Sequence, residues 1–432
     1  MGELFEGGEG VNPGTLASRR PISSVTPTQT FDKLALLIIE YASPAKVVYK
    51  RTIDNWSNPD NKASYPWSTE EGQGRYATVT LTGDECLEEG KNYMAYVIGY
   101  HAGTYGGYEP FKDIEVGDYY NHTEVVTVPE NGSVDEVFAG AEVFWVKDGI
   151  ILSQRSSEAE VEYGLMVARR QVAGTFGYFT RIPVTAGGKK VAKLRLVSTK
   201  ENRTVIFGGF RSVDDNLNFH KDNVINGMNP ATDYDCVLAG SLKKDAFSVY
   251  EIDLCKWFPG NTENALLPLD ANGDGYLDSA DTNWQTDEEN YPKGTISLPS
   301  GTVFGDSFMV SIAMFQDDVD EGIPTFQMQM LDAGGKVIKY WDVVLRNYET
   351  AGENRTLVSL PEGVDGRTEI MELENIDTET CFSIVRNRLY TMGEKSHSQN
   401  YGEDEPIDLS IANELVLDAR HEWQIMNSII FN

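Results

Sequence analysis

Alternating apolar and polar residues between positions 161 and 210 predict the best-defined strands of the chain. Val161, Tyr163, Leu165 and Val167 alternate with Glu162, Gly164, Met166 and Ala168. A period of two is typical of a strand with one buried face. Gly187 and Gly188 permit a chain reversal, and a second alternating run begins at Val191. This pattern predicts the central meander of an antiparallel sheet.

The rest of the chain contains many more short segments of the same kind. Residues 34–41 form a continuous apolar run, which predicts a buried strand. Further strands are predicted at 46–53, 75–83, 92–101, 124–129, 141–146, 236–242, 248–254, 306–315, 325–331, 336–345, 381–390 and 414–432. Their number and length predict an all-β protein built from sandwiches.

The length of 432 residues predicts two domains, each with its own core. Residues 1–30 are rich in Gly, Pro, Ser and Thr and lack periodicity, which indicates a flexible lead-in. Residues 212–233 have little apolar pattern, so we place the junction there. The predicted N-terminal β-sandwich therefore spans residues 31–225, and the predicted C-terminal β-sandwich spans 226–432.

The charge and the apolar content exclude several classes of function. The net charge of −31 argues against nucleic-acid binding, because phosphate contacts need clustered Lys and Arg. No apolar run is long enough to span a membrane. The four cysteines lack the spacing of a metal site. The first residues contain no export signal, so we expect either a cytosolic protein or one whose signal has been removed.

Several segments, in order along the chain, resemble the fimbrillin-associated anchor family of type V fimbriae. They are FAGAEVF (138–144), VARRQVAG (167–174), GYFTRIP (177–183), KLRLVST (193–199), IVRNRLYTMG (384–393) and LVLDARHEWQIMNSIIFN (415–432). The resemblance implies transthyretin-like sandwiches and a fimbrial anchor, shaft or tip subunit that takes part in cell adhesion. It also implies an exported lipoprotein at the outer-membrane surface or in the fimbrium, attached to the membrane only through a lipid upstream of this chain.

The resemblance further implies partners and a mode of assembly. Other fimbrial subunits are expected to bind by strand addition, and a host or bacterial surface receptor or glycan is a second expected partner. Leu415, Leu417 and Ala419 alternate with polar residues, so the terminal stretch is a candidate donor strand. The alternative, which we favour for an anchor, is that this stretch pairs within its own domain. Arg19 is a candidate processing site, because Pro21 hinders cleavage after Arg20 and leaves only the bond after Arg19 open. An ordinary polar tail is the favoured alternative.

One stretch has explicit chemistry, a predicted Ca²⁺-binding loop in the second domain. Its oxygen donors are Asp270, Asn272, Asp274, Asp278, Asp281 and the carbonyl of Tyr276. These occupy positions 1, 3, 5, 9, 12 and 7 of a calcium loop, with Gly275 at the sharp turn. A chance acidic turn is the alternative. We expect the ion to be structural, as in a single dockerin-type loop.

No sequence feature indicates an enzyme. The chain contains no GxSxG, HExxH, phosphate-binding or dinucleotide-binding motif. A second hypothesis is a surface glycan-binding protein that uses aromatic loops. Its candidate ligand contacts are Trp56, Trp67, Tyr105 and Tyr108. We favour the alternative that these aromatic residues close the end of a sandwich.

Overall fold

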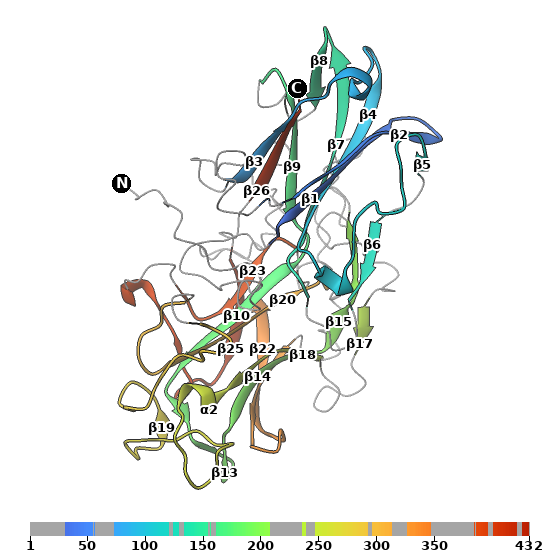
Figure 1. The fold of residues 1–432 in the computed structure, drawn as a ribbon. Coiled ribbons are helices and arrows are strands. Elements are labelled where there is room, and N and C mark those ends of the chain that lie inside the picture. Colours follow the sequence, from blue (N-terminus) through green and yellow to red (C-terminus); the bar gives the residue numbers. More distant parts are fainter. Residues whose placement is uncertain are drawn as a thin grey trace, which may run out of the picture.

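The computed structural model describes most of the two predicted domains. It covers residues 31–54, 56, 73–120, 124–128, 134–153, 156, 161–207, 236–238, 247–292, 296–312, 326–346, 384, 386–395, 401–420 and 426–431. Nearly all regular structure in these ranges is strand (Figure 1), which confirms the all-β prediction. Over the same ranges, no helix has the length and apolar character needed to cross a membrane.

A first sheet of nine strands forms the upper half of the molecule in Figure 1. Its order is β3-β26-β9-β7-β4-β1-β2-β5, and β8 pairs with β7. The strands are β1 (Lys33–Glu40), β2 (Ala45–Ile53), β3 (Gln73–Val79), β4 (Asn92–Tyr100), β5 (Tyr119–Tyr120), β7 (Phe138–Lys147), β8 (Ile150–Ser153), β9 (Gly164–Arg170) and β26 (Met426–Phe431). Buried side chains of β3, β9 and β26 share one core with those of β1, β4 and β7.

β1 is buried, as its continuous apolar run predicts, and the structure shows that both of its faces are covered. Leu36 lies in the core shared with β26, whereas Leu37 belongs to a second cluster with Phe111. A two-stranded ribbon of β6 (Glu124–Thr127) and β16 (Thr204–Phe207) contributes to this second cluster. The apolar run without alternation therefore follows from two buried faces.

A second sheet of nine strands forms the lower half. Its order is β18-β14-β21-β22-β25-β23-β10-β20, and β24 pairs with β10. The strands are β10 (Ala173–Thr180), β14 (Lys193–Ser198), β18 (Phe247–Asp253), β20 (Thr302–Met309), β21 (Phe326–Leu331), β22 (Val337–Arg346), β23 (Leu389–Met392), β24 (Ile407–Asp408) and β25 (Leu415–Arg420). Shorter elements are β11 (Ile182–Pro183), β12 (Thr185–Ala186), β13 (Lys189–Lys190), β15 (Lys200–Asn202), β17 (Cys236–Leu238), β19 (Tyr276–Leu277) and α2 (Leu254–Trp257). One large core lies against this sheet.

The strands between residues 161 and 210 do not form one meander, which corrects that prediction. β9 lies in the first sheet, whereas β10 and β14 lie in the second and do not pair with each other. The reversal at Gly187 and Gly188 is confirmed, since β12 and β13 pair across it. Both glycines have positive φ, 55° and 76°. Local alternation indicates a buried face, but it does not choose the partner strand.

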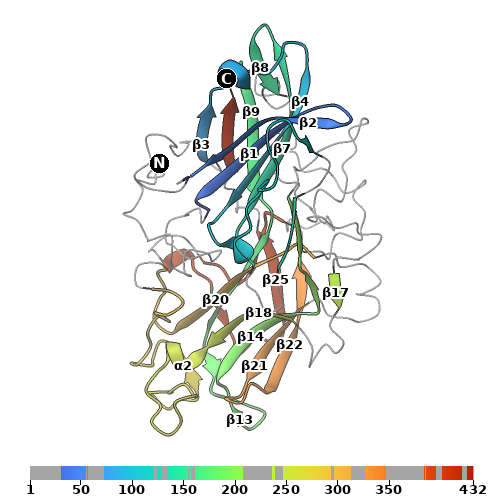
Figure 2. The same cartoon turned by 45° about the vertical axis from the view of Figure 1, so that its right-hand side comes forward.

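The predicted domain limits also need correction. The sequence predicts one boundary near residue 225, yet β10 and β14 belong to the second sheet and β26 belongs to the first. In both views the red C-terminal segment therefore contributes a strand to each half of the molecule (Figures 1 and 2). Residues 212–233, where the sequence predicts the junction, lie outside the described residues.

Candidate functional site

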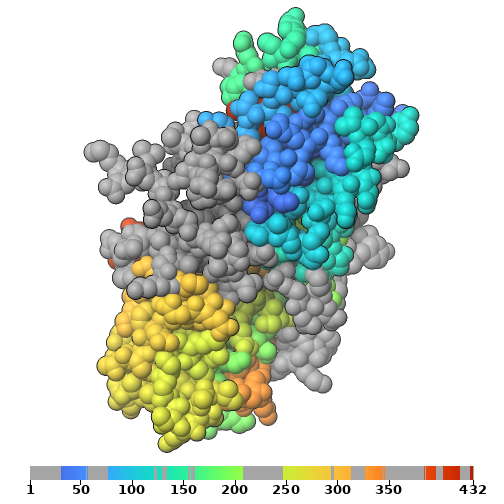
Figure 3. Space-filling model, viewed as in Figure 1, coloured from blue at the N-terminus to red at the C-terminus, as the bar shows by residue number. Residues whose placement is uncertain are grey.

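The acidic loop at residues 270–281 is attached through its backbone to the segment that follows β10. It belongs to the yellow lobe at the lower left of Figure 3. Within the loop, β19 pairs with β11, the short strand that follows β10. The Val184 N–H donates to the Gly275 carbonyl at 3.1 Å. These hydrogen bonds attach the loop to the segment that follows β10.

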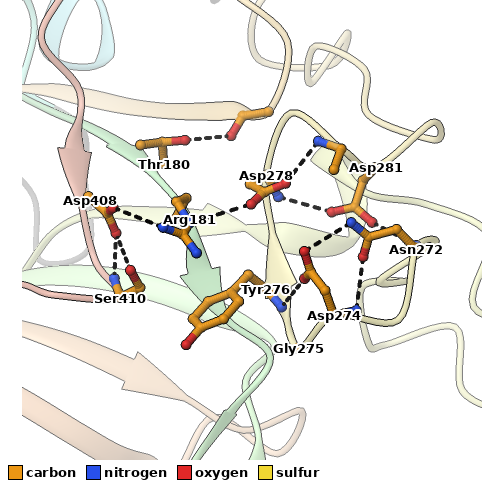
Figure 4. A network of polar contacts seen from close by, with 12 residues as sticks. Thr180, Arg181, Asn272, Asp274, Gly275, Tyr276, Asp278, Asp281, Asp408 and Ser410 are labelled. Carbon is orange, nitrogen blue, oxygen red and sulfur yellow. Dashed lines mark hydrogen bonds and ion pairs between the residues drawn. The ribbon is translucent and has the colours of Figure 1, made fainter.

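Side chains of the loop accept hydrogen bonds from its own backbone. The Asp270 carboxylate accepts from the N–H groups of Gly273 at 2.6 Å and Gly275 at 2.8 Å. Asp274 accepts from the Tyr276 N–H at 2.9 Å (Figure 4). Such bonds stabilise tight turns. The turn needs glycine at 275, where φ is 93°.

Asp281 is nearly inaccessible, with 2% of its surface exposed. Its carboxylate accepts from the N–H groups of Ala271 at 2.6 Å and Asp278 at 2.9 Å. The Asn272 amide donates to Asp274 at 3.0 Å (Figure 4). The predicted ligand residues therefore form one hydrogen-bonded loop, in which N–H groups offset part of the negative charge.

Arg181 places a positive charge beside the loop. Its guanidinium lies 3.6 Å from Asp278, 3.7 Å from Asp408 and 5.0 Å from the centre of the Tyr276 ring (Figure 4). Because the Arg181 side chain is 48% exposed, each ion pair contributes little stability. Arg181 nevertheless connects the loop with β24, the strand that contains Asp408.

The donors of this loop have the chemistry that Ca²⁺ prefers, since all are oxygen atoms. Across the described residues, however, no group of three or more His, Cys, Asp or Glu side chains lies close enough together to hold a metal ion. The carboxylates of Asp270 and Asp281 face backbone N–H groups. Each carboxylate oxygen has a second lone pair for a cation. Calcium binding stays a prediction.

Trp56, a predicted glycan contact, is instead part of the first core. Its side chain is fully buried, and its ring stacks on Phe31 with 6.0 Å between the ring centres. The prediction of a ligand contact is therefore wrong for Trp56, and the predicted alternative, an aromatic residue that closes the fold, is correct for it. Trp67 lies outside the described residues.

Tyr105 and Tyr108 are partly exposed, and their hydroxyl groups are hydrogen-bonded to buried acidic residues. The Tyr105 hydroxyl donates to the Asp135 carbonyl at 2.9 Å, and the Tyr108 hydroxyl donates to Glu124 at 2.6 Å. The Tyr108 ring also stacks on Phe207. Burial, and then the neighbouring acidic group, raises the pKa of each tyrosine. Both side chains therefore stabilise the loop that contains them.

Leu415, Leu417 and Ala419 lie in an interior strand, which corrects the prediction of a mobile donor there. β25 pairs in parallel with β22 and antiparallel with β23. Leu415 and Leu417 are buried in the second core. The favoured alternative, pairing within its own domain, is therefore confirmed for β25 but not for β26, which pairs with β3 and β9.

The strand that joins a distant sheet is β26, at the end of the chain. It lies between β3, to which it is parallel, and β9, to which it is antiparallel. Ile429 and Phe431 are fully buried, and the Phe431 ring contacts the Phe144 ring edge-on at 5.0 Å. The first sheet is therefore completed by the last residues of the chain.

A cluster of buried arginines lies where the chain passes from β9 to β10. Arg169, Arg170, Arg386 and Arg388 are each almost completely buried. Arg170 donates to the Glu136 carboxylate at 2.6 Å, and Arg386 donates to the Gln171 side chain at 2.6 Å. Burial lowers the pKa of Arg386 to about 9. Burial also lowers the pKa of Arg170, although Glu136 opposes the shift.

None of these arginines is among the sequence-based predictions of functional residues. The sequence feature that could have identified them is the presence of two arginines within each of two apolar segments, VARRQV and IVRNRLY. Because buried charges are costly unless they are paired, such positions indicate a polar network inside the fold. The structure brings the two motifs together, since the Asn387 N–H donates to the Val172 carbonyl at 3.0 Å.

Comparisons with known proteins leave the family open. No family model matches the chain, and no curated protein is significantly similar to it. Among solved structures, one similar chain is a proposed adhesin from Bacteroides thetaiotaomicron, with 10% identity, 72% of each chain covered and a TM-score of 0.26. A similarity this slight supports no statement about fold or function.

The candidate processing site, Arg19, lies outside the described residues.

Proposed function

We propose that this chain is a structural subunit of a cell-surface fimbrium, located at the anchored end of the filament. β26 carries the proposal. It comes from the end of the chain and completes a sheet formed by residues from the first half. Subunits that assemble by strand addition need a sheet that accepts an extra strand in this way.

The first sheet already contains β26, a strand from the end of the same chain, which supports a position at the end of the filament. β3 and β9 already hydrogen-bond to β26, so this site is filled within one chain. A subunit whose terminal strand is used internally does not offer that strand to a neighbour. The proposal includes two transthyretin-like domains, export to the outer-membrane surface and a lipid attached upstream of this chain.

The acidic loop is included in the proposal as a calcium-stabilised loop. Its lobe lies at the surface of the molecule, where a cation from solution has access (Figure 3). The buried state of Trp56 removes one of the contacts on which the glycan-binding alternative depends. We therefore do not propose glycan binding.

The proposal is tested by shearing filaments from native cells and identifying their proteins by mass spectrometry. We expect this chain to co-purify with the filaments and to remain with the cell fraction when shear is mild. Cells that lack the chain are expected to release their filaments into the medium. Normal filaments that stay attached to such cells, together with absence of the chain from purified filaments, would contradict the proposal.

A further inference from the structure

Lys395 and Asp404 form a buried ion pair beyond the end of β23. The Lys395 Nζ lies 2.9 Å from one carboxylate oxygen of Asp404 and 3.3 Å from the other. Their side chains are only 2% and 1% exposed. The Tyr178 hydroxyl donates to the nearer oxygen at 3.2 Å. An amine, a carboxyl group and a hydroxyl therefore meet in a site that excludes water.

The backbone on both sides keeps these groups together. Glu394 and Glu405 exchange two N–H···O hydrogen bonds, of 2.9 and 2.8 Å. Lys395 and Asp404 directly follow and precede this bridge, so they are cross-strand neighbours. Gly393 has a φ of 84°, and a Cβ there would approach the Glu405 carbonyl oxygen to 2.9 Å. The close approach of the two segments therefore requires glycine at this position.

Among the residues that the structure describes, the other short ion pairs lack this combination of chemistry and burial. Lys193 and Glu251 are 2.6 Å apart, but their side chains are 33% and 36% exposed. Arg170 and Glu136 are buried, but a guanidinium stays protonated and is not a nucleophile. Lys395 and Asp404 therefore combine a primary amine with a carboxyl group in a buried site.

We propose that Lys395 and Asp404 condense to form an intramolecular isopeptide bond. A proton passes from the Lys395 ammonium to the Asp404 carboxylate, and the neutral Nζ attacks Cγ. The Nζ–Cγ bond forms, one Cγ–O bond breaks, and that oxygen leaves as water with two protons that the ammonium supplied. The third ammonium proton stays on the amide nitrogen. The reaction is balanced without an oxidant or another reactant.

The geometry supplies two sources of acceleration. The amine and carboxyl are held at reacting distance, which replaces a bimolecular encounter by an intramolecular step. The Tyr178 hydroxyl donates to the Asp404 oxygen on which negative charge develops during the attack. The product is a covalent link between the end of β23 and the segment leading to β24, and it removes two buried charges.

The proposal is tested on the full chain by intact mass under denaturing conditions and by tryptic peptide mapping. We expect an intact mass lower than that of the sequence by one water molecule. A linked Lys395 resists trypsin, so residues 389–420 are expected as one peptide, also lighter by one water. A full sequence mass with separate peptides 389–395 and 396–420 would overturn the proposal, whatever the behaviour of any variant.

Two variants locate the link. Lys395→Arg keeps the positive charge but removes the nucleophile, and Asp404→Ala removes the carboxyl; both are expected to show the full mass. Persistence of the water loss in Lys395→Arg would overturn the assignment, because it would place the dehydration elsewhere. Lys193, in its exposed pair, is the control within the same digest and is expected to be cleaved normally. In Tyr178→Phe we expect about a hundredfold slower linkage.

Discussion

β25 and β26 are consecutive strands with similar local character, yet they complete different sheets. Each has two fully buried apolar side chains and lies parallel to one neighbour and antiparallel to the other. The partners of β25 are β22 and β23, which lie in the second half of the chain. The partners of β26 are β3 and β9, which lie in the first half. Because the two strands have similar character, their different sequence distance from their partners is our reason to expect β26 to be the separable strand.

Removal of residues 426–432 is expected to have the largest effect and to act on one sheet. It exposes the backbones of β3 and β9 and empties the places of Ile429 and Phe431. Loss of a buried Phe side chain alone costs about 3–5 kcal/mol, a large part of a typical domain's stability. Hydrogen exchange should show loss of protection in β3 and β9, with β21 and β22 still protected.

A synthetic peptide of residues 424–432 is expected to restore protection to the truncated chain. The same peptide with Phe431→Asp is the matched control, because a charge in the apolar site prevents insertion. Equal loss of protection in both sheets, or no rescue by the native peptide, would show that β26 is not a separable strand.

The next largest effect is expected at the buried arginines, where the chain passes from β9 in the first sheet to β10 in the second. Arg170→Met leaves the Glu136 carboxylate buried beside an apolar group, which is expected to cost about 3–5 kcal/mol. The double variant Arg170→Met, Glu136→Leu removes both charges and should recover most of that stability. Denaturant unfolding measures all three proteins. If the double variant is as unstable as the single one, the ion pair is not the cause.

A glycine in each sheet offers a graded comparison. A Cβ at Gly140 would lie 2.1 Å from the Val167 carbonyl oxygen, a backbone atom that has little freedom to move. A Cβ at Gly305 would meet the flexible side chain of Ile252 at 2.6 Å. We expect Gly305→Ala to cost about 1–3 kcal/mol and Gly140→Ala to cost more. A larger loss of unfolding free energy in Gly305→Ala than in Gly140→Ala would contradict this prediction.

The smallest expected effect is that of calcium on the acidic loop. At Ca²⁺ a few-fold above its Kd, binding should stabilise the second sheet by about 1 kcal/mol. Asp274→Asn keeps an oxygen that accepts from the Tyr276 N–H but removes one charge, and it should reduce this stabilisation. Thermal melting with Ca²⁺ and with a strong chelator gives the measurement. Identical curves for the unmodified protein would contradict the calcium prediction.

Local pattern predicted the strands but not their partners. The run at residues 34–41 corresponds to β1, and the segments predicted at 92–101 and 325–331 correspond to β4 and β21. The division into sheets was not predicted, because period-two alternation identifies a face and not a neighbour. The predicted glycan contact at Trp56 failed for a related reason, since the pattern around Trp56 does not say whether its ring faces the core.

The sequence by itself determined that the protein is all-β, that residues 187–188 form a reversal, and which residues make up the acidic loop. These features depend on propensity, spacing and turn chemistry between neighbouring residues. Only the tertiary structure decided that β26 completes the first sheet, that Arg170 meets Glu136, and that Lys395 lies beside Asp404 in a dry site. Those outcomes depend on burial and on partners that only the folded chain brings together, because hydrophobic attraction is non-directional.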